Sequence, residues 1–136
     1  MLRWITLFYF ALLVGIIIMA DVGARIFSVI HQVPMGDKIG HFFLIGFAAF
    51  LLNLWLKCRI FTVGRSRWLW GSAVLSVVVS LEEFLQVYLP HRNSSIWDLA
   101  ADILGIIVFG QLARWVHSRA DRRRYAGEGK MGLPGN

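Results

Sequence analysis

Four long apolar runs dominate this sequence. They cover residues 4–20, 39–56, 68–89 and 96–116, and 57% of the chain is hydrophobic while only 16% is charged. A helix needs about 20 mostly apolar residues to span the hydrocarbon of a bilayer. The runs lack the alternation of barrel strands, so in lipid their backbone can be satisfied only as helices. The sequence therefore predicts an all-α fold, a four-helix transmembrane bundle.

Short linkers and a tail account for the remaining chain. Residues 21–38, 57–67 and 90–95 join the four runs, and none of these segments is long enough for a soluble domain. A lone cysteine, Cys58, excludes an intramolecular disulfide and a cysteine-rich metal site. We predict one membrane domain over residues 1–120, followed by a basic, flexible cytoplasmic tail over residues 121–136.

Basic residues are unevenly distributed among the segments between the runs. Eleven of the 14 Lys and Arg residues lie before the first run, in residues 57–67, or after residue 113. The other three are Arg25, Lys38 and Arg92. The positive-inside rule then predicts a multi-pass protein of the bacterial cell membrane with both termini in the cytoplasm. The net charge of +6 is therefore interpreted as a topology signal, with the basic residues lying beside the anionic lipid of the cytoplasmic leaflet. No fold signature of nucleic-acid binding accompanies it.

The first run has a second interpretation. A cleaved signal peptide has an apolar core of about 7–15 residues followed by small residues. The run of 17 uncharged residues is slightly longer than that, and Val22-Gly23-Ala24 offers a cleavage site. Cleavage would leave three crossings and place the basic segments on opposite sides of the membrane. The uncleaved helix keeps the charge asymmetry and is our prediction.

Ionisable residues occur inside three of the runs at similar depth. An ionisable side chain within a membrane costs roughly 2.5–3.5 kcal/mol on insertion scales and is usually functional. At 1.5 Å per residue, His41, Glu83 and Asp102 lie roughly 5, 6 and 9 Å below the outer interface. Three predicted helices thus contribute polar groups to one layer, where we expect a water-accessible pocket with Asp102 at its floor.

Helical spacing adds further polar residues to this layer. Side chains three or four positions apart meet on one face of a helix. Pairs with this spacing are Asp37 with His41, Lys38 with His41, Glu83 with Gln86, and Asp98 with Asp102. Glu82 lies about 100° round the helix from Glu83, and the spacing leaves open which of the two faces inward. Small residues at Gly40, Ala101 and Gly105 predict a close approach of the helices there.

Asp98 also has a purely structural interpretation. Ser95 and Asp98 have the spacing of a capping box, with Asp in place of the usual Glu or Gln. On this interpretation Asp98 is an exposed carboxylate that stabilises the start of the fourth helix. The alternative, a ligand-binding side chain in the polar layer, is equally consistent with the sequence.

The polar residues occur in an order that resembles a known family. The order is Asp37-Lys38-x-x-His41, then Glu83-x-x-Gln86, then Arg92, then Asp98 ahead of a glycine-containing helix. Over residues 37–110 it resembles the VanZ-like family of small polytopic bacterial membrane proteins. That family is named for a member encoded with glycopeptide-antibiotic resistance and associated with reduced teicoplanin sensitivity. The resemblance implies a role in the cell envelope. Asp102 departs from the pattern, in which Asn is expected.

The leading functional hypothesis is a membrane protein that binds or processes a lipid or lipid-linked cell-wall-precursor headgroup at the outer leaflet. Its acid–base residues would be His41, Glu83 and Asp102. Its ligand-binding residues would be Asp37, Lys38, Gln86, Arg92 and Asp98, with Arg92 suited to a phosphate. The sequence leaves open whether a reaction is catalysed and identifies no cofactor. A metal held by His41, Glu83 and Asp102 stays an alternative.

Two other classes of function remain open. In the first, the polar residues form an interhelical network with a structural or accessory role. Such contacts average only about 0.6 kcal/mol each, which is little stabilisation for so many buried charges. The second is a transporter, which would have to be a homo-oligomer, because four helices enclose little space.

Overall fold

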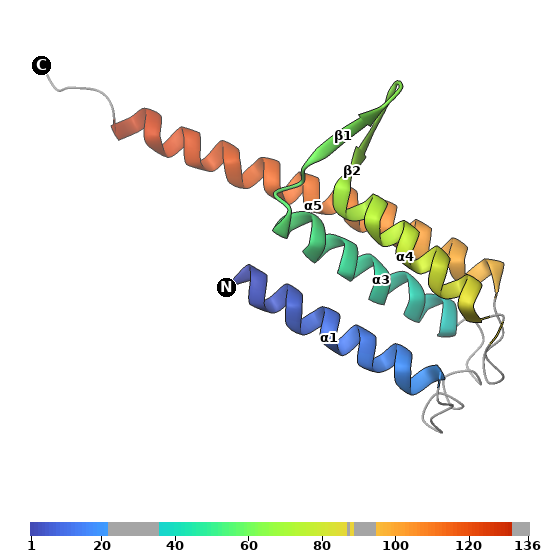
Figure 1. The fold of residues 1–136 in the computed structure, drawn as a ribbon. Coiled ribbons are helices and arrows are strands. Elements are labelled where there is room, and N and C mark those ends of the chain that lie inside the picture. The colour runs from blue at the N-terminus through green and yellow to red at the C-terminus, as the bar shows by residue number, and fades with distance from the viewer. Residues whose placement is uncertain (22–35, 87, 89–94, 132–136) are drawn as a thin grey trace, which may run out of the picture.

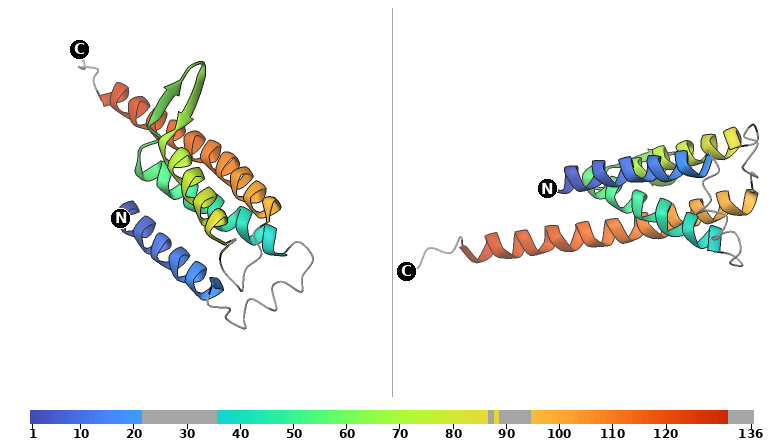
Figure 2. Two further views of the ribbon diagram at one scale, coloured as in Figure 1. Left: turned by 45° about the vertical axis from the view of Figure 1, so that its right-hand side comes forward. Right: turned by 90° about the horizontal axis from the view of Figure 1, so that it is seen from below.

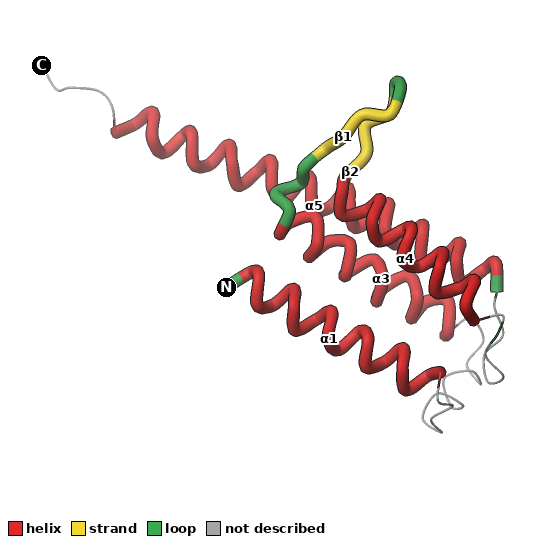
Figure 3. The backbone as a smooth tube through the Cα atoms, in the orientation of Figure 1, coloured by secondary structure: helices red, strands yellow, loops and turns green. Residues whose placement is uncertain are grey.

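The computed structural model describes residues 1–21, 36–86, 88 and 95–131. The described chain is mostly helical and also contains one two-stranded sheet (Figures 1 and 3). In chain order the elements are α1 (Leu2–Asp21), α3 (Gly36–Trp55), β1 (Ile60–Val63), β2 (Ser66–Leu69), α4 (Trp70–Gln86) and α5 (Ile96–Met131).

The helices lie side by side and alternate in direction along the chain. α3 lies between α1 and α5, and α4 packs on both α3 and α5 (Figures 1 and 2). The end of α1, the start of α3, the end of α4 and the start of α5 meet at one end of the bundle. The N-terminus and the β-hairpin lie at the other end, where α5 continues past the other helices. Residues distant in sequence are therefore brought together at the first end.

The contact between α3 and α5 is the most extensive in the structure. Two glycines allow it. A Cβ atom on Gly105 would lie 2.4 Å from the backbone oxygen of Phe42, and one on Gly46 would lie 2.5 Å from the ring of Phe109. Gly105 was expected at a close approach and Gly46 was not, whereas a Cβ on Gly40 would meet nothing within 4 Å. Around this contact lies the apolar core, formed by Leu13, Ile45, Ala48, Ala49, Leu75, Val79 and Ile106.

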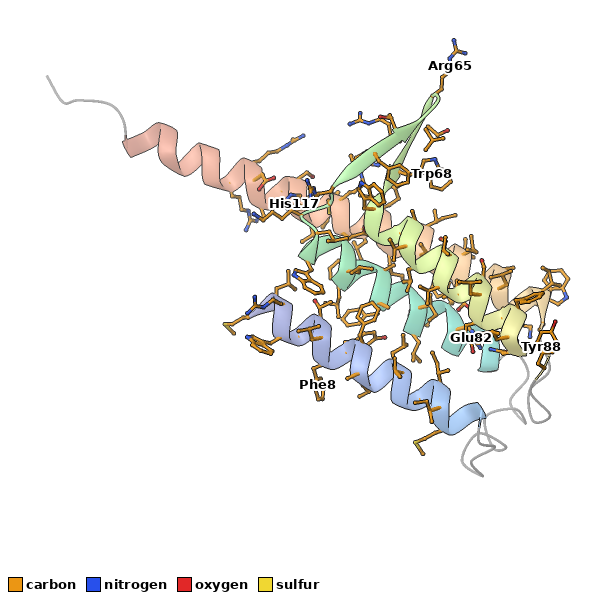
Figure 4. All side chains as sticks on the ribbon, in the orientation of Figure 1. Phe8, Arg65, Trp68, Glu82, Tyr88 and His117 are labelled. Carbon is orange, nitrogen blue, oxygen red and sulfur yellow. The ribbon has the colours of Figure 1, made fainter. Side chains whose placement is uncertain are left out.

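The outer surfaces of the helices are apolar. Within the described residues, three helical segments are long and apolar enough to cross a membrane: Leu2–Met19, Lys38–Trp55 and Ile96–Arg123. Large apolar side chains point outward from α1 and α4 as well, and Figure 4 shows Phe8 of α1 turned away from the bundle. α4 has 17 residues and ends in a polar sequence. It is therefore shorter than the crossing that the sequence predicted over residues 68–89.

The predicted linker over residues 57–67 contains most of the β-hairpin. The chain leaves α3 with Lys57 and Cys58 at φ of 52° and 49°, and the N–H of Cys58 donates to the carbonyl of Asn53 at 2.7 Å. This is the hydrogen-bond pattern of a Schellman C-cap. The strands then pair antiparallel, and Gly64 (φ 59°) opens a two-residue turn with Arg65. Glycine in this position is typical of type II′ hairpins.

α5 extends beyond its predicted end at residue 116. It continues to Met131, so most of the tail expected to be flexible is helical. The run of apolar residues ends near Val116, but residues 117–126 are rich in Arg and contain no Gly or Pro, and Arg favours helix without needing a buried face. The last residues, 132–136, lie outside the described part of the chain.

Candidate functional site

The start of α3, the end of α4 and the start of α5 lie at one end of the bundle (Figure 1). Polar side chains of these three helices form hydrogen bonds and ion pairs there. These polar side chains belong to the first two turns of α3, the end of α4 and the first two turns of α5. We call the resulting group the polar cluster. Among the described side chains it consists of Lys38, His41, Glu82, Glu83, Gln86, Asp98 and Asp102.

Lys38 and Asp98 join α3 to α5 at the outer edge of the polar cluster. The Nζ atom of Lys38 lies 2.9 Å from Oδ1 of Asp98, and their side chains are 33% and 8% exposed. Asp98 is therefore a buried, ion-paired carboxylate. The interpretation of Asp98 as an exposed helix-capping residue is wrong, because Asp98 is buried and its carboxylate forms an ion pair with Lys38 of α3.

His41 and Asp102 form a second link, one turn farther along both helices. The Nδ1 atom of His41 lies 3.1 Å from one carboxylate oxygen of Asp102 and 3.2 Å from the other. The Asp102 side chain is only 2% exposed, while that of His41 is 18% exposed. With Nδ1–H donating to Asp102, the carboxylate orients the ring and makes Nε2 the proton-accepting atom. The pair has the arrangement of an acid–base dyad.

Glu83 is the glutamate that faces inward. It is buried, whereas Glu82 is half-buried. Oε1 of Glu83 accepts a hydrogen bond from the backbone N–H of Ser95, just before α5. Oε2 is also buried and has no hydrogen-bond partner among the described residues. The site therefore contains one buried acceptor atom that its described protein surroundings do not satisfy.

Gln86 lies in the polar cluster but contacts the other glutamate. Its Nε2 donates to Oε1 of Glu82, and its side chain is only 2% exposed. Figure 4 shows Glu82 and Tyr88 at this same end of the molecule. The spacing predicted that Glu83 and Gln86 share one face of the helix, and both are buried in α4. It did not identify Glu82 as the hydrogen-bond partner of Gln86.

Two predicted ligand-binding residues cannot be placed in the cluster. Asp37 belongs to α3, but its side chain lies outside the described part of the structure. Arg92 and the loop around it also lie outside the described residues. So does the Val22-Gly23-Ala24 segment of the alternative signal-peptide interpretation.

The described part of the polar cluster is rich in carboxylates. Four carboxylates, Glu82, Glu83, Asp98 and Asp102, surround one lysine and one histidine. Within the described residues, no three His, Cys, Asp or Glu side chains lie together in a way that could hold a metal ion. The arrangement offers hydrogen-bond acceptors and a His–Asp pair that can transfer a proton.

Sequence reasoning missed the backbone of Ser95 as a member of the site. The capping-box spacing pointed to Ser95 as the start of a helix, but the carboxylate that binds its N–H comes from α4. Only the packing of α4 on α5 creates this contact. No protein-family profile, curated protein or solved structure matches the chain.

Proposed function

We propose that this chain is a multi-pass protein of the bacterial cell membrane that binds or processes an envelope headgroup at the outer leaflet. The buried part of the polar cluster around Glu83, His41 and Asp102 would be the binding site, and the headgroup would belong to a membrane lipid or a lipid-linked cell-wall precursor. The observation that carries the proposal is the buried Oε2 of Glu83, which has no hydrogen-bond partner among the described residues, together with the His41–Asp102 pair at the same end of the bundle. A buried polar atom left without a partner costs about 1–3 kcal/mol, and a ligand that donates a hydrogen bond would recover that cost.

Carboxylates are in excess among the described side chains of the polar cluster, and this excess indicates the chemistry of the headgroup. Groups with hydroxyl, amide or amino donors, such as sugars and amines, match the acceptor oxygens of Glu83 and Asp102. Lys38, which is one-third exposed at the edge of the cluster, can meet a phosphate at the cost of loosening its contact with Asp98. A headgroup with both a phosphate and several donors would use both halves of the site.

Processing, as distinct from binding, would depend on His41. The Asp102 carboxylate stabilises a protonated imidazole, so His41 can take a proton from a hydroxyl and return it to a leaving group. Glu83 would orient the headgroup by accepting a hydrogen bond from another of its donor groups. A link to glycopeptide-antibiotic tolerance comes only from the VanZ-like resemblance and is part of this proposal.

Two adjacent glutamates provide a matched test. The wild-type chain, Glu83→Gln and Glu82→Gln would be purified from bacterial membranes in mild detergent, and the retained lipids would be identified by native mass spectrometry. We expect the wild type and Glu82→Gln to retain the same polar lipid, and Glu83→Gln to lose it at an unchanged protein level. Equal lipid retention by all three proteins would contradict the proposal.

A structural role is the second candidate, and the internal pairing of the charges favours it. Lys38 with Asp98 and His41 with Asp102 each link α3 to α5. If these pairs serve only to hold the helices together, Glu83→Gln would be mild in every assay, because glutamine keeps a hydrogen bond to the N–H of Ser95. Loss of lipid by a stably folded Glu83→Gln protein separates the two candidates.

A further inference from the structure

The β-hairpin has one apolar face and lies at the opposite end of the bundle from the polar cluster. The register pairs Phe61 with Trp68 and Val63 with Ser66, so these four side chains lie on one face of the ribbon. Val63 and Trp68 are 62% and 52% exposed. Figure 1 shows the hairpin projecting sideways from the helices. Most of its apolar face is therefore covered by no other described part of the chain.

This face continues directly into the outer surface of α4. The ring of Phe61 lies 4.5 Å from that of Trp70, the first residue of the helix. Beyond Trp70, exposed apolar side chains follow at helical spacing along α4, namely Val74, Val77, Val78, Leu81 and Leu85. In a membrane protein an outer apolar stripe of this kind contacts lipid. The apolar face of the hairpin thus extends the lipid-contacting surface of α4 sideways.

The charges of the hairpin all have one sign. Lys57, Arg59, Arg65 and Arg67 are exposed, and residues 57–70 contain no acidic residue. Figure 4 shows Arg65 at the tip of the hairpin, with Trp68 nearer the bundle. Arg67 lies on the opposite face of the ribbon from Trp68, because adjacent residues of a strand alternate in direction. Aromatic side chains on one face and arginines at the tip and other face suit the boundary between lipid and water.

We propose that the hairpin is an interfacial anchor that binds the anionic headgroups of the leaflet on its side of the membrane. Phe61, Val63 and Trp68 enter the interfacial zone beside α4, where Trp is favoured. The arginines stay at headgroup level and bind phosphate, because their guanidinium groups pair with phosphate bidentately. The bound surface is thus a phospholipid bilayer rich in anionic lipid. This inference needs only the apolar helices and is independent of the function proposed for the polar cluster.

Spin labels on neighbouring residues test the orientation of the hairpin. In a Cys58→Ser background, the full chain would carry a nitroxide at Val63→Cys or at Thr62→Cys, in nanodiscs of phosphatidylglycerol and phosphatidylcholine. Thr62 is also exposed, but it lies on the other face of the ribbon. We expect the Val63 label to be several-fold more accessible to oxygen than to a nickel chelate, and the Thr62 label to show the reverse. Equal nickel accessibility of the two labels would overturn the proposal.

Brominated lipids test the preference for anionic headgroups with Cys58 unchanged. Brominated phosphatidylglycerol should quench tryptophan emission more than brominated phosphatidylcholine at the same mole fraction, and Trp68→Phe should reduce the difference. The double variant Arg65→Gln/Arg67→Gln should lose the difference while keeping the quenching by the neutral lipid. Equal quenching by both lipids in the wild type would overturn the anionic preference. Dipolar broadening between Val63 labels of two copies would instead identify the face as a contact between chains.

Discussion

Glu83 of α4 caps the start of α5 by accepting a hydrogen bond from the backbone N–H of Ser95. The first N–H groups of a helix have no partner within the helix, and a side chain usually satisfies them from nearby in sequence. Here the acceptor comes from the preceding helix, 12 residues earlier. One carboxylate oxygen thus fixes the junction of α4 and α5. The other is buried without a hydrogen-bond partner among the described residues, and it is the oxygen that the proposed ligand would meet.

Replacing Glu83 should separate these two roles. Glu83→Ala removes the acceptor of the partly buried N–H of Ser95, which should lower the free energy of unfolding by about 1–3 kcal/mol. Glu83→Gln retains an acceptor oxygen and should stay within about 0.5 kcal/mol of the wild type. Thermal unfolding of the full chain in detergent measures both. Similar destabilisation by the two variants would show that the charge, and not the cap, stabilises the junction.

The α3–α5 contact should be sensitive to one added methyl group. Gly105→Ala places a Cβ atom 2.4 Å from the backbone oxygen of Phe42, so the helices must separate. We expect a loss of about 1–3 kcal/mol in the free energy of unfolding, as for other overpacked sites. Gly40→Ala is the control on α3, because its Cβ atom would meet nothing within 4 Å. It should be neutral or slightly stabilising, since alanine favours helix. A neutral Gly105→Ala would contradict the close contact.

The sequence predicted the helices better than the connection between the second and third apolar runs. Runs of uncharged residues identify α1, α3 and the first part of α5, because only a helix satisfies its backbone in lipid. The hairpin was missed because two strands of four residues carry little periodic signal. Its arginines suggested a topology signal and nothing more. The end of α5 was missed because hydropathy marks the end of an apolar surface and not the end of a helix.

The layer of polar residues could be predicted, but its pairing could not. Counting residues from the ends of the runs placed His41, Glu83 and Asp102 at a common depth, and the structure brings them to one end of the bundle. Which carboxylate meets which base depends on the register of α3 against α5. That register is set by the fit of Gly105 against Phe42, which spacing along one helix does not reveal.

The His41–Asp102 contact should have a measurable coupling energy. Membrane-protein hydrogen bonds measured by double-mutant cycles average about 0.6 kcal/mol and reach about 1.7 kcal/mol. Because Asp102 is almost fully buried, we expect a value in the upper half of this range from the cycle of His41→Ala and Asp102→Ala. The control is His117 with Asp121, a partly exposed pair on α5 whose Nε2 and Oδ2 atoms are 3.5 Å apart. Its coupling should be below about 0.5 kcal/mol. Equal values for the two pairs would argue against a special role for the buried one.

The Cys58 thiol should react slowly. It is buried beside Leu69 and Ala113, and burial raises the pKa of the thiol above its usual value. Less thiolate is then present at neutral pH, so maleimide labelling should be several-fold slower than for Val63→Cys in a Cys58→Ser background. The folded state favours the neutral thiol over the thiolate. The resulting contribution of Cys58 to the free energy of unfolding is complete below the pKa of the unfolded thiol, and it is lost as the pH rises through the pKa of the folded thiol. Fast labelling of native Cys58 at pH 7 would contradict the burial.

The distribution of basic residues predicts the orientation of the bundle in the membrane, and reporters can measure it. The hairpin and the N-terminus share one end of the structure, and the polar cluster lies at the other. Eleven of the 14 Lys and Arg residues belong to segments predicted to be cytoplasmic. A reporter fused after Asn136, or inserted between Gly64 and Arg65 at the hairpin turn, should therefore behave as cytoplasmic. A reporter placed between His31 and Gly36 should behave as external. An external C-terminus would move the polar cluster to the cytoplasmic leaflet, and outer-leaflet headgroups could then no longer be its ligands.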